Sequence, residues 1–198
     1  MKHSSTFNKS IGVLSLALLF FACDKDPRII GRVADKSLDG KEIYLFKYSD
    51  GEAFDSDTTL IKGDKFSFSG SGINEGVYYL LMDDPSVEGE IAQGLPLYLS
   101  DKKATVLIQK SQVTIGGNPE NDELQKMINK TRAEARKEKE IIIAYLHDNI
   151  PTPLGEEIFL NNIDNFSLEE IEELLSEANE HLRFNLQVVE ALSQIKDN

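Results

Sequence analysis

Short apolar runs alternate with turn residues through the first half of the chain. Lys65-Phe66-Ser67-Phe68-Ser69 is the clearest run, because its strict alternation places both phenylalanines on one face of a strand. Runs of this kind predict strands over 29–33, 42–48, 54–61, 65–69, 77–82, 95–99, 104–109 and 112–115. Their spacing is typical of an antiparallel β-sandwich or an open barrel.

Beyond residue 117 the apolar positions change to the three- and four-residue spacing of a helix. Asn118 can cap such a helix, with Pro119 at its first position, and we expect the helix to run to about His147. Its middle, residues 130–140, contains two alanines as its only apolar residues. We therefore expect that stretch to be solvated.

Two further helical stretches follow. A pair of prolines at 151 and 153 breaks the chain, and a short helix is expected over 154–163. The next helix is expected to begin at Ser167, which forms a capping box with Glu170. Its apolar spacing continues nearly to the C-terminus through Leu186, Val189, Leu192 and Ile195.

Together these patterns predict an α+β fold. An N-terminal antiparallel β-sandwich or open barrel is expected over 29–117, and a helical segment over 118–198. Two short regions precede them, a signal peptide over 1–22 and a tether over 23–28.

The signal peptide is predicted from an apolar run at 11–21. Lys2 and Lys9 precede it, and no acidic residue occurs among the first 22. A run this short does not cross the roughly 30 Å hydrocarbon core of a membrane as a helix. The pattern therefore indicates a cleaved leader rather than a retained transmembrane span.

The leader ends at Cys23, the only cysteine of the chain. The stretch Leu18-Leu19-Phe20-Phe21-Ala22-Cys23 resembles a bacterial lipobox, in which the cysteine sulfur takes a diacylglycerol and the peptide bond before it is cut. Phe20 and Phe21 depart from the usual aliphatic and small residues. The resemblance implies that Cys23 is acylated, carries palmitate and anchors the protein in the membrane. The alternative is a plain secreted protein in which the cysteine is incidental.

The residues after the cysteine, Asp24, Lys25 and Asp26, resemble the acidic, lysine-containing signal of surface-exported Bacteroidetes lipoproteins. The resemblance implies an outer-membrane lipoprotein, either periplasmic or exposed at the cell surface. A solvated tether is the alternative interpretation. Asp57-Thr58-Thr59 resembles the short O-glycosylation acceptor of exported proteins of the same group, which makes Thr58 a candidate glycosylation site.

Acidic residues outnumber basic ones. Removing residues 1–22 takes away two lysines and no acids, which leaves 19 basic residues against 34 acidic ones and a net charge of −15. Nucleic acid is therefore not expected as a partner, because phosphate binding depends on clustered Lys and Arg.

Four segments together resemble a known family. They are Ile30-Gly31-Arg32-Val33, Glu42-Ile43-Tyr44-Leu45 with the turn before it, 55–58 leading to 63–70, and 117–122. They are similar to the N-terminal domain of unknown function of Bacteroidetes thiol-disulfide interchange lipoproteins. In that family a β-rich domain and a helical segment precede a thioredoxin-like module with a Cys-x-x-Cys pair.

The resemblance covers about residues 27–198, and we expect this chain to be without that module. It therefore implies a fold and a compartment. It implies no redox residue, because dithiol exchange needs an attacking and a resolving thiol, and the chain has one cysteine.

No catalytic residue, metal site or cofactor is predicted. His147 and His181 fall on different predicted helices without a histidine partner one turn away. Asp55-Ser56-Asp57 begins like a calcium loop, but Leu60 and Phe66 stand where such a loop has Gly and Glu. The glycine-rich stretch 70–76 precedes a predicted strand, whereas a dinucleotide fingerprint opens a helix.

For the function of this chain we have three hypotheses, in order of preference. The favoured hypothesis is a lipid-anchored envelope protein with a non-catalytic role, which binds an envelope protein partner or stabilises an assembly. The alternative is a lipoprotein of an uptake system that captures a glycan or peptide on its β face, and a hydrolase comes third. Tyrosines that could stack on a ligand, although each also suits the core or rim of a sheet, are Tyr44, Tyr48, Tyr78, Tyr79 and Tyr98.

Overall fold

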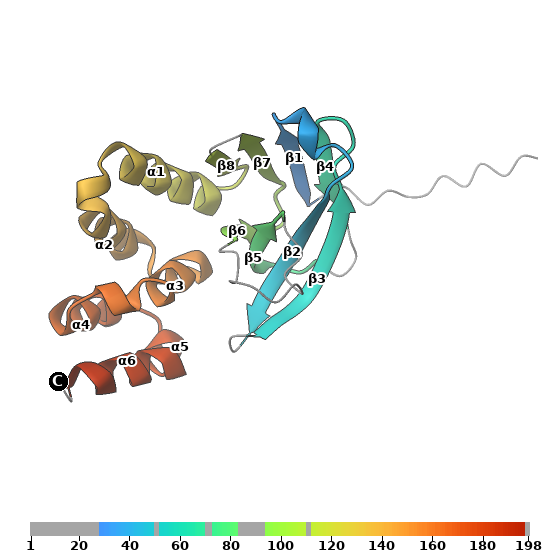
Figure 1. Cartoon of the computed structure of the whole chain (residues 1–198). Helices are drawn as coiled ribbons and strands as arrows, with labels where there is room; N and C mark the ends of the chain where they lie inside the picture. The colour runs from blue at the N-terminus through green and yellow to red at the C-terminus, as the bar shows by residue number, and fades with distance from the viewer. Residues whose placement is uncertain (1–27, 50–51, 70–72, 83–93, 110–111, 197–198) are drawn as a thin grey trace, which may run out of the picture.

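The computed structural model describes residues 28–49, 52–69, 73–82, 94–109 and 112–196. Strands form two packed sheets, and helices are stacked against one side of them (Figure 1). The strands are β1 (Ile29–Val33), β2 (Glu42–Ser49), β3 (Glu52–Leu60), β4 (Lys65–Phe68), β5 (Gly76–Leu81), β6 (Leu95–Leu99), β7 (Ala104–Gln109) and β8 (Gln112–Gly116). Every predicted strand is present, with ends that differ by at most two residues from the prediction.

One sheet has the strand order β4-β1-β7-β8 and the other the order β3-β2-β5-β6. The second is antiparallel throughout, and we call it the antiparallel sheet. The first is mixed, because β1 and β7 run parallel with Ile29 opposite Ala104. The chain reaches β7 by crossing from the other sheet rather than through a hairpin, and a crossover allows the parallel direction. The α+β fold with two open sheets is confirmed, and the parallel pair is the departure from an all-antiparallel sandwich.

The core between the sheets follows the predicted alternation. Phe66 and Phe68 are buried while Lys65 and Ser67 of the same strand are exposed. The two phenylalanine rings meet edge to face, with centroids 6.2 Å apart. Gly31, opposite Phe66 on β1, makes room for this ring, since a Cβ atom there would lie 1.9 Å from it.

The helical segment is a stack that begins directly after β8. Its α-helices are α1 (Pro119–Ala133), α2 (Glu138–Asn149), α3 (Pro153–Leu160), α4 (Leu168–Glu177), α5 (Glu180–Arg183) and α6 (Leu186–Lys196). Short 3-10 turns are η1 (Lys36–Leu38), η2 (Ala135–Lys137) and η3 (Ile163–Asn165).

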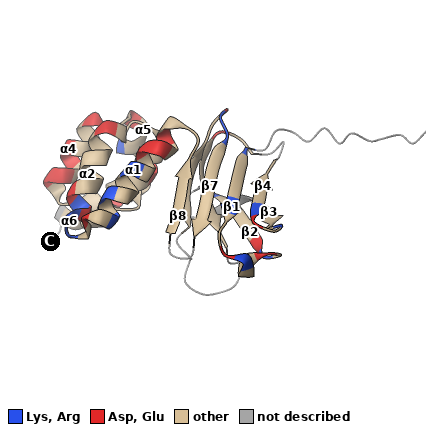
Figure 2. Ribbon diagram, turned by 90° about the horizontal axis from the view of Figure 1, so that it is seen from above, with Lys and Arg blue, Asp and Glu red and all other residues tan. Residues whose placement is uncertain are grey.

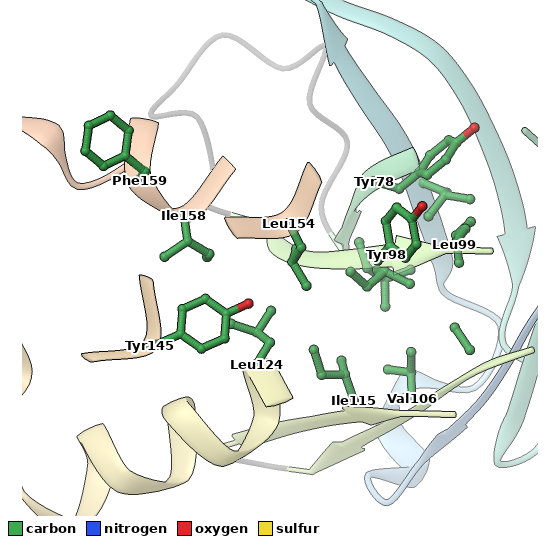
Figure 3. Packing of buried hydrophobic residues seen from close by; sticks show 14 of the residues in the cluster. Tyr78, Tyr98, Leu99, Val106, Ile115, Leu124, Tyr145, Leu154, Ile158 and Phe159 are labelled. Atoms are coloured by element: carbon green, nitrogen blue, oxygen red, sulfur yellow. The ribbon is translucent and has the colours of Figure 1, made fainter. Parts of the chain in front are cut away.

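The sandwich and the helices share one continuous hydrophobic cluster. Leu124 of α1 and Leu154 of α3 lie at the open side of the sandwich, near Ile115 of β8 and Tyr98 of β6 (Figure 3). Both leucines are buried, and a fully buried leucine contributes about 2 kcal/mol relative to an exposed one. The helices are therefore packed onto the sandwich through apolar contacts.

The expectation of one helix from Asn118 to about His147 was wrong. The helix ends at Ala133, Glu134 leaves the helical conformation with φ −129° and ψ 51°, and α2 begins at Glu138 after η2. Residues 132–140 are all exposed, as expected, so no packing holds a straight helix there. The bend instead turns α2 back, so that Ile141, Ile142, Tyr145 and Leu146 are buried.

The C-terminal stretch also consists of separate helices rather than one. Ala178 is extended between α4 and α5, and a second break precedes α6. Each break changes the helical phase, so Leu186 and Val189 are exposed at 70% and 46%, while Val188 is buried. The predicted apolar face of α6 was therefore wrong for Leu186 and Val189, whereas Leu192 and Ile195 are partly buried against the core cluster, as predicted.

Candidate functional site

Two asparagines at the start of α1 attach the helix to the antiparallel sheet. Asn118 caps α1, because its Oδ1 accepts a hydrogen bond from the Asn121 backbone N–H at 2.9 Å. Its Nδ2 donates to the Tyr98 carbonyl oxygen at 2.9 Å. Asn121 Oδ1 accepts from the Tyr98 backbone N–H at 2.7 Å, and its Nδ2 donates to the same Tyr98 carbonyl at 2.9 Å.

Tyr98 lies on β6, the edge strand of the antiparallel sheet. An edge strand that is covered by other parts of the protein needs partners for its outward N–H and C=O groups. Asn121 supplies both with one amide group, much as a neighbouring strand would. Both asparagines are buried, with 2% (Asn118) and 0% (Asn121) of their surface exposed, so these bonds replace water.

Gln125, one turn later on α1, makes the equivalent contact with the mixed sheet. Its Oε1 accepts a hydrogen bond from the Ile115 backbone N–H at 2.6 Å, and Ile115 lies on the edge strand β8. Near the end of the helix, the Arg132 guanidinium donates to the Val113 carbonyl of β8 at 3.3 Å. Helix α1 therefore bridges the edge strands of both sheets along the open side of the sandwich.

The turn before α1 requires glycine. Gly117 has φ +97°, and a Cβ atom at this position would lie 2.2 Å from the Lys103 carbonyl oxygen. Its N–H donates to Asp122 Oδ1 at 3.2 Å. The 117–122 segment, which carries part of the family resemblance, thus has a structural role, and we call Gly117, Asn118, Asn121 and Gln125 the sandwich-helix joint.

A second polar contact connects the sandwich to α3. The Tyr79 hydroxyl on β5 donates to Glu157, and the Asn161 side-chain amide donates to the same hydroxyl at 2.8 Å. Nearby on β6, the Tyr98 hydroxyl donates to Glu75. Burial, followed by the hydrogen bond to Glu75, raises the pKa of Tyr98 to about 12. The Tyr98 phenol is therefore neutral at physiological pH and acts as a hydrogen-bond donor.

The candidate stacking tyrosines divide into two groups. Tyr78 and Tyr98 are buried in the core cluster, and Tyr79 is held by α3, so none of these rings forms an open platform. Tyr44 is half-buried and stacks on Phe46, with centroids 6.2 Å apart and planes 8° from parallel. The Tyr48 side chain lies outside the described residues.

The candidate glycosylation site Thr58 is exposed on the edge strand β3. Its backbone N–H donates to Asp57 Oδ1 at 2.8 Å, and Tyr44 lies opposite it on β2. The Asp55 side chain lies outside the described residues. Thr58 is thus sterically accessible and next to the Tyr44–Phe46 pair.

The histidines are on separate helices. His147 of α2 lies with Nδ1 3.1 Å from Glu177 Oε2 of α4, and His181 is exposed on α5. Within the part of the chain that the structure describes, no group of three or more His, Cys, Asp or Glu side chains is placed to hold a metal ion.

The predicted lipidation and export residues Cys23, Asp24, Lys25 and Asp26 lie outside the described residues. Among the described helices, none combines the length and the apolar character needed to span a membrane.

The edge contacts of Asn121 and Gln125 were not predicted. Their sequence signal is a pair of amide side chains four residues apart, directly after a helix cap, which places both on one face of the helix. That spacing does not reveal which backbone groups the amides contact, because Tyr98 is 23 residues away from Asn121.

The sandwich and the joint residues Gly117, Asn118 and Asn121 lie within a family match. Residues 28–124 match the family model described as Domain of unknown function (DUF4369). This region begins just before β1 and ends in α1 at Leu124, whereas α2 to α6 lie beyond it. Neither a curated protein nor a solved structure matches the chain. The chain therefore carries a DUF4369 domain over residues 28–124.

Proposed function

We propose that this protein is a lipid-anchored envelope protein with a non-catalytic binding or scaffolding role. It is related to the accessory domain of thiol-disulfide interchange lipoproteins. The observation that carries the proposal is the sandwich-helix joint, in which the most strongly buried polar side chains of the described residues bind backbone groups of the two sheets. These groups make a rigid support for the helices.

The anchor is supported by the N-terminal sequence. Cys23 follows an apolar leader of signal-peptide length, and acylation gives this single thiol a role. Each buried methylene adds about 0.8 kcal/mol of membrane affinity, and stable anchoring takes more than one acyl chain. The diacylglycerol of this lipoprotein class meets that requirement.

The scaffolding role is supported by the joint and by the shared hydrophobic cluster. Because α1 is bound to an edge strand of each sheet, the helices beyond it have a fixed position relative to the sandwich. A fixed arrangement reduces the entropy that a binding surface loses when its partner docks. The helical segment thus suits a protein partner in the envelope.

The Cys23→Ser variant tests the anchor, because serine cannot form the thioether to diacylglycerol. Cells that express the wild-type chain or this variant are fed an alkyne analogue of palmitate, lysed and separated into membrane and soluble fractions. We expect label and membrane recovery for the wild type and neither for Cys23→Ser. Asp26→Asn is the matched control, and it should keep both. A wild-type chain without label would contradict the anchor.

In-cell crosslinking tests the binding role. Photo-crosslinking residues are placed at exposed positions of the helical segment, for example at Glu190, and at exposed positions of the mixed sheet, for example at Ser67. We expect a discrete protein adduct from the helical positions and none from the sheet positions. Helical positions that crosslink to nothing would oppose a scaffolding role.

Protease treatment of intact cells determines the face of the outer membrane. Cleavage of the chain in intact cells would place it at the cell surface, as the Asp24-Lys25-Asp26 signal implies. Complete protection until the outer membrane is opened would place it in the periplasm.

Capture of a glycan or peptide is the second candidate, and it rests on Tyr44 and Phe46. These residues alternate with the core residues Ile43 and Leu45. Tyr44 is partly exposed, whereas Phe46 is buried and supports the Tyr44 ring without offering surface of its own. A partly exposed ring stacked on a second ring can bind the apolar face of a sugar.

A glycan and peptide panel tests this candidate with the soluble chain from Asp24 to Asn198. A ligand whose binding is lost in Tyr44→Ala and kept in Tyr44→Phe would support capture on this face. Binding that is unchanged in Tyr44→Ala, or no binding to the panel, would oppose it.

A further inference from the structure

The basic residues of the helical segment are concentrated at one place. Residues 118–198 contain eight Lys and Arg residues, and six of them fall within 126–139, where Glu134 and Glu138 are the only acids. We call these six the basic elbow, because they surround the bend between α1 and α2; they are Lys126, Lys130, Arg132, Arg136, Lys137 and Lys139.

The basic elbow is exposed to solvent. Lys126 and Lys130 are exposed on α1, and every residue from 132 to 140 is exposed. Lys126, Lys137 and Lys139 each form a water-exposed ion pair, with Glu123, Glu134 and Glu170 respectively. Within the described residues, Lys130, Arg132 and Arg136 form no ion pair, so the unbalanced positive charge of the elbow lies on these three. The elbow therefore presents a net positive surface in a protein whose mature chain has a charge of −15.

An acidic surface lies next to the elbow. Residues 140–182 contain eleven Asp and Glu residues and no Lys or Arg. We call the exposed members on and just beyond α4 the acidic face; they are Glu169, Glu172, Glu173, Glu177 and Glu180. Acidic positions gather on α4 in Figure 2.

The two surfaces share a border. Lys139 of the elbow forms an ion pair with Glu170 at the start of α4, with Nζ and Oε2 2.7 Å apart. Both the bend between α1 and α2 and helix α4 lie on the side of the helical segment that faces away from the sandwich (Figure 1). A positive and a negative patch are thus adjacent on one open surface.

We propose that this surface binds a second copy of the chain about a twofold axis, so that the basic elbow of each copy meets the acidic face of the other. Adjacent patches of opposite charge are complementary to themselves when rotated by a twofold axis. The net negative charge of the two copies does not prevent the contact, because charges more than about 8 Å apart are largely screened at physiological salt.

The contact depends on charge, which predicts its response to salt. Exposed ion pairs are individually weak, so several must act together in each of the two equivalent contacts. We expect a reversible dimer at low salt, with a dissociation constant that rises at least tenfold between about 0.05 M and about 0.5 M NaCl because of screening.

Charge reversal tests the proposal by sedimentation velocity on the chain from Asp24 to Asn198, which keeps every described residue. The elbow variant carries Lys130→Glu and Arg136→Glu, and the face variant carries Glu172→Lys and Glu173→Lys. All four positions are exposed, so we expect wild-type circular dichroism from both variants. Each variant alone should be monomeric, since like charges then meet across the axis.

An equimolar mixture of the two variants is the decisive experiment. The reversed elbow of one variant then meets the reversed face of the other, and the two native patches also meet, so a heterodimer should form. Lys36→Glu with Lys41→Glu is the matched control. It makes the same change in net charge at exposed positions of the sandwich, and it should dimerise like the wild type.

Three results would overturn the proposal. The first is a wild-type chain that stays monomeric at low salt. This result would overturn the proposal even if the monomer bound anionic lipid vesicles through the elbow. The second is a control that dissociates as the elbow variant does. The third is a mixture of the two variants that stays monomeric.

Discussion

The replacement of Asn121 by alanine is the most direct perturbation of the joint between sandwich and helices. The Asn121 amide accepts a hydrogen bond from the Tyr98 N–H and donates one to the Tyr98 carbonyl. The carbonyl keeps a second donor, the Asn118 amide, whereas Asn121 is the acceptor for the N–H. Alanine at this position therefore removes both bonds and leaves a buried donor without a partner.

The expected cost follows from these contacts. A buried donor without a partner costs about 1–3 kcal/mol, and the lost second hydrogen bond about 1 kcal/mol. Alanine has a higher helix propensity than asparagine, which offsets about 0.5 kcal/mol. We expect the free energy of unfolding to fall by about 1.5–3.5 kcal/mol, out of the 5–15 kcal/mol that is usual for a domain.

Urea unfolding of the soluble chain measures this change. Far-UV circular dichroism follows the helices, and fluorescence follows the six tyrosines of a chain that has no tryptophan. Asn165→Ala is the matched control, since Asn165 is exposed, and its substitution should cost less than about 0.5 kcal/mol. The two optical transitions of the wild type should coincide, because one hydrophobic cluster spans sandwich and helices.

The reasoning would be refuted if Asn121→Ala cost no more than Asn165→Ala. It would also be refuted if the helical and tyrosine transitions of the wild type separated, since the joint would then fail to couple the two parts. Asn118→Ala with Asn121→Ala should cost a different amount from the sum of the two single changes, because both amides bind one Tyr98 carbonyl.

Three further outcomes are expected. Gly117→Ala should lower the free energy of unfolding by at least about 3 kcal/mol, because φ is +97° and the Cβ atom would strike the Lys103 carbonyl. Gly40 also has a positive φ, +79°, but a Cβ atom there would meet open space, so Gly40→Ala should cost about 1 kcal/mol in the same urea titration. Burial raises the pKa of Tyr145 to about 12, so the folded state holds this proton more tightly than the unfolded state. This contribution to the free energy of unfolding is fully present below about pH 10, and about 2–3 kcal/mol of it is lost as the pH rises toward 12. Tyr145→Phe should lose less stability than the wild type over this pH range, and equal losses would contradict the assignment. Ser167→Ala should cost about 1 kcal/mol by removing the cap of α4, and thermal unfolding that is unchanged would show that the capping box contributes nothing.

Local patterns predicted the strands and the starts of α1, α3 and α4 well. Alternation along 65–69 placed Phe66 and Phe68 in the core, and the spacing of Ser167 and Glu170 predicted the capping box of α4. These features depend on residues that are close in the sequence, so the sequence alone carries the information.

Features that depend on distant contacts were missed or wrong. The bend at Glu134 forms because α2 packs back against other helices, which periodicity within 119–147 does not reveal. The parallel pairing of β1 with β7 depends on the path between the sheets. The contact of Asn121 with Tyr98 likewise requires the helix to lie against an edge strand, and only the folded arrangement shows that.

The charge pattern of the helical segment is an intermediate case. The run of basic residues over 126–139 and the acidic stretch after it are visible in the sequence. That the two surfaces share a border depends on the turn of α2 and the ion pair of Lys139 with Glu170.

The mass of the mature protein tests the lipid anchor most directly. The chain is purified from the membranes of its source cells, and its N-terminal peptide is analysed by mass spectrometry. The account predicts a chain that begins at Cys23 and carries a diacylglycerol on its sulfur, with or without a further acyl chain on its amino group. A chain that retains residues 1–22, or an unmodified Cys23, would contradict the account.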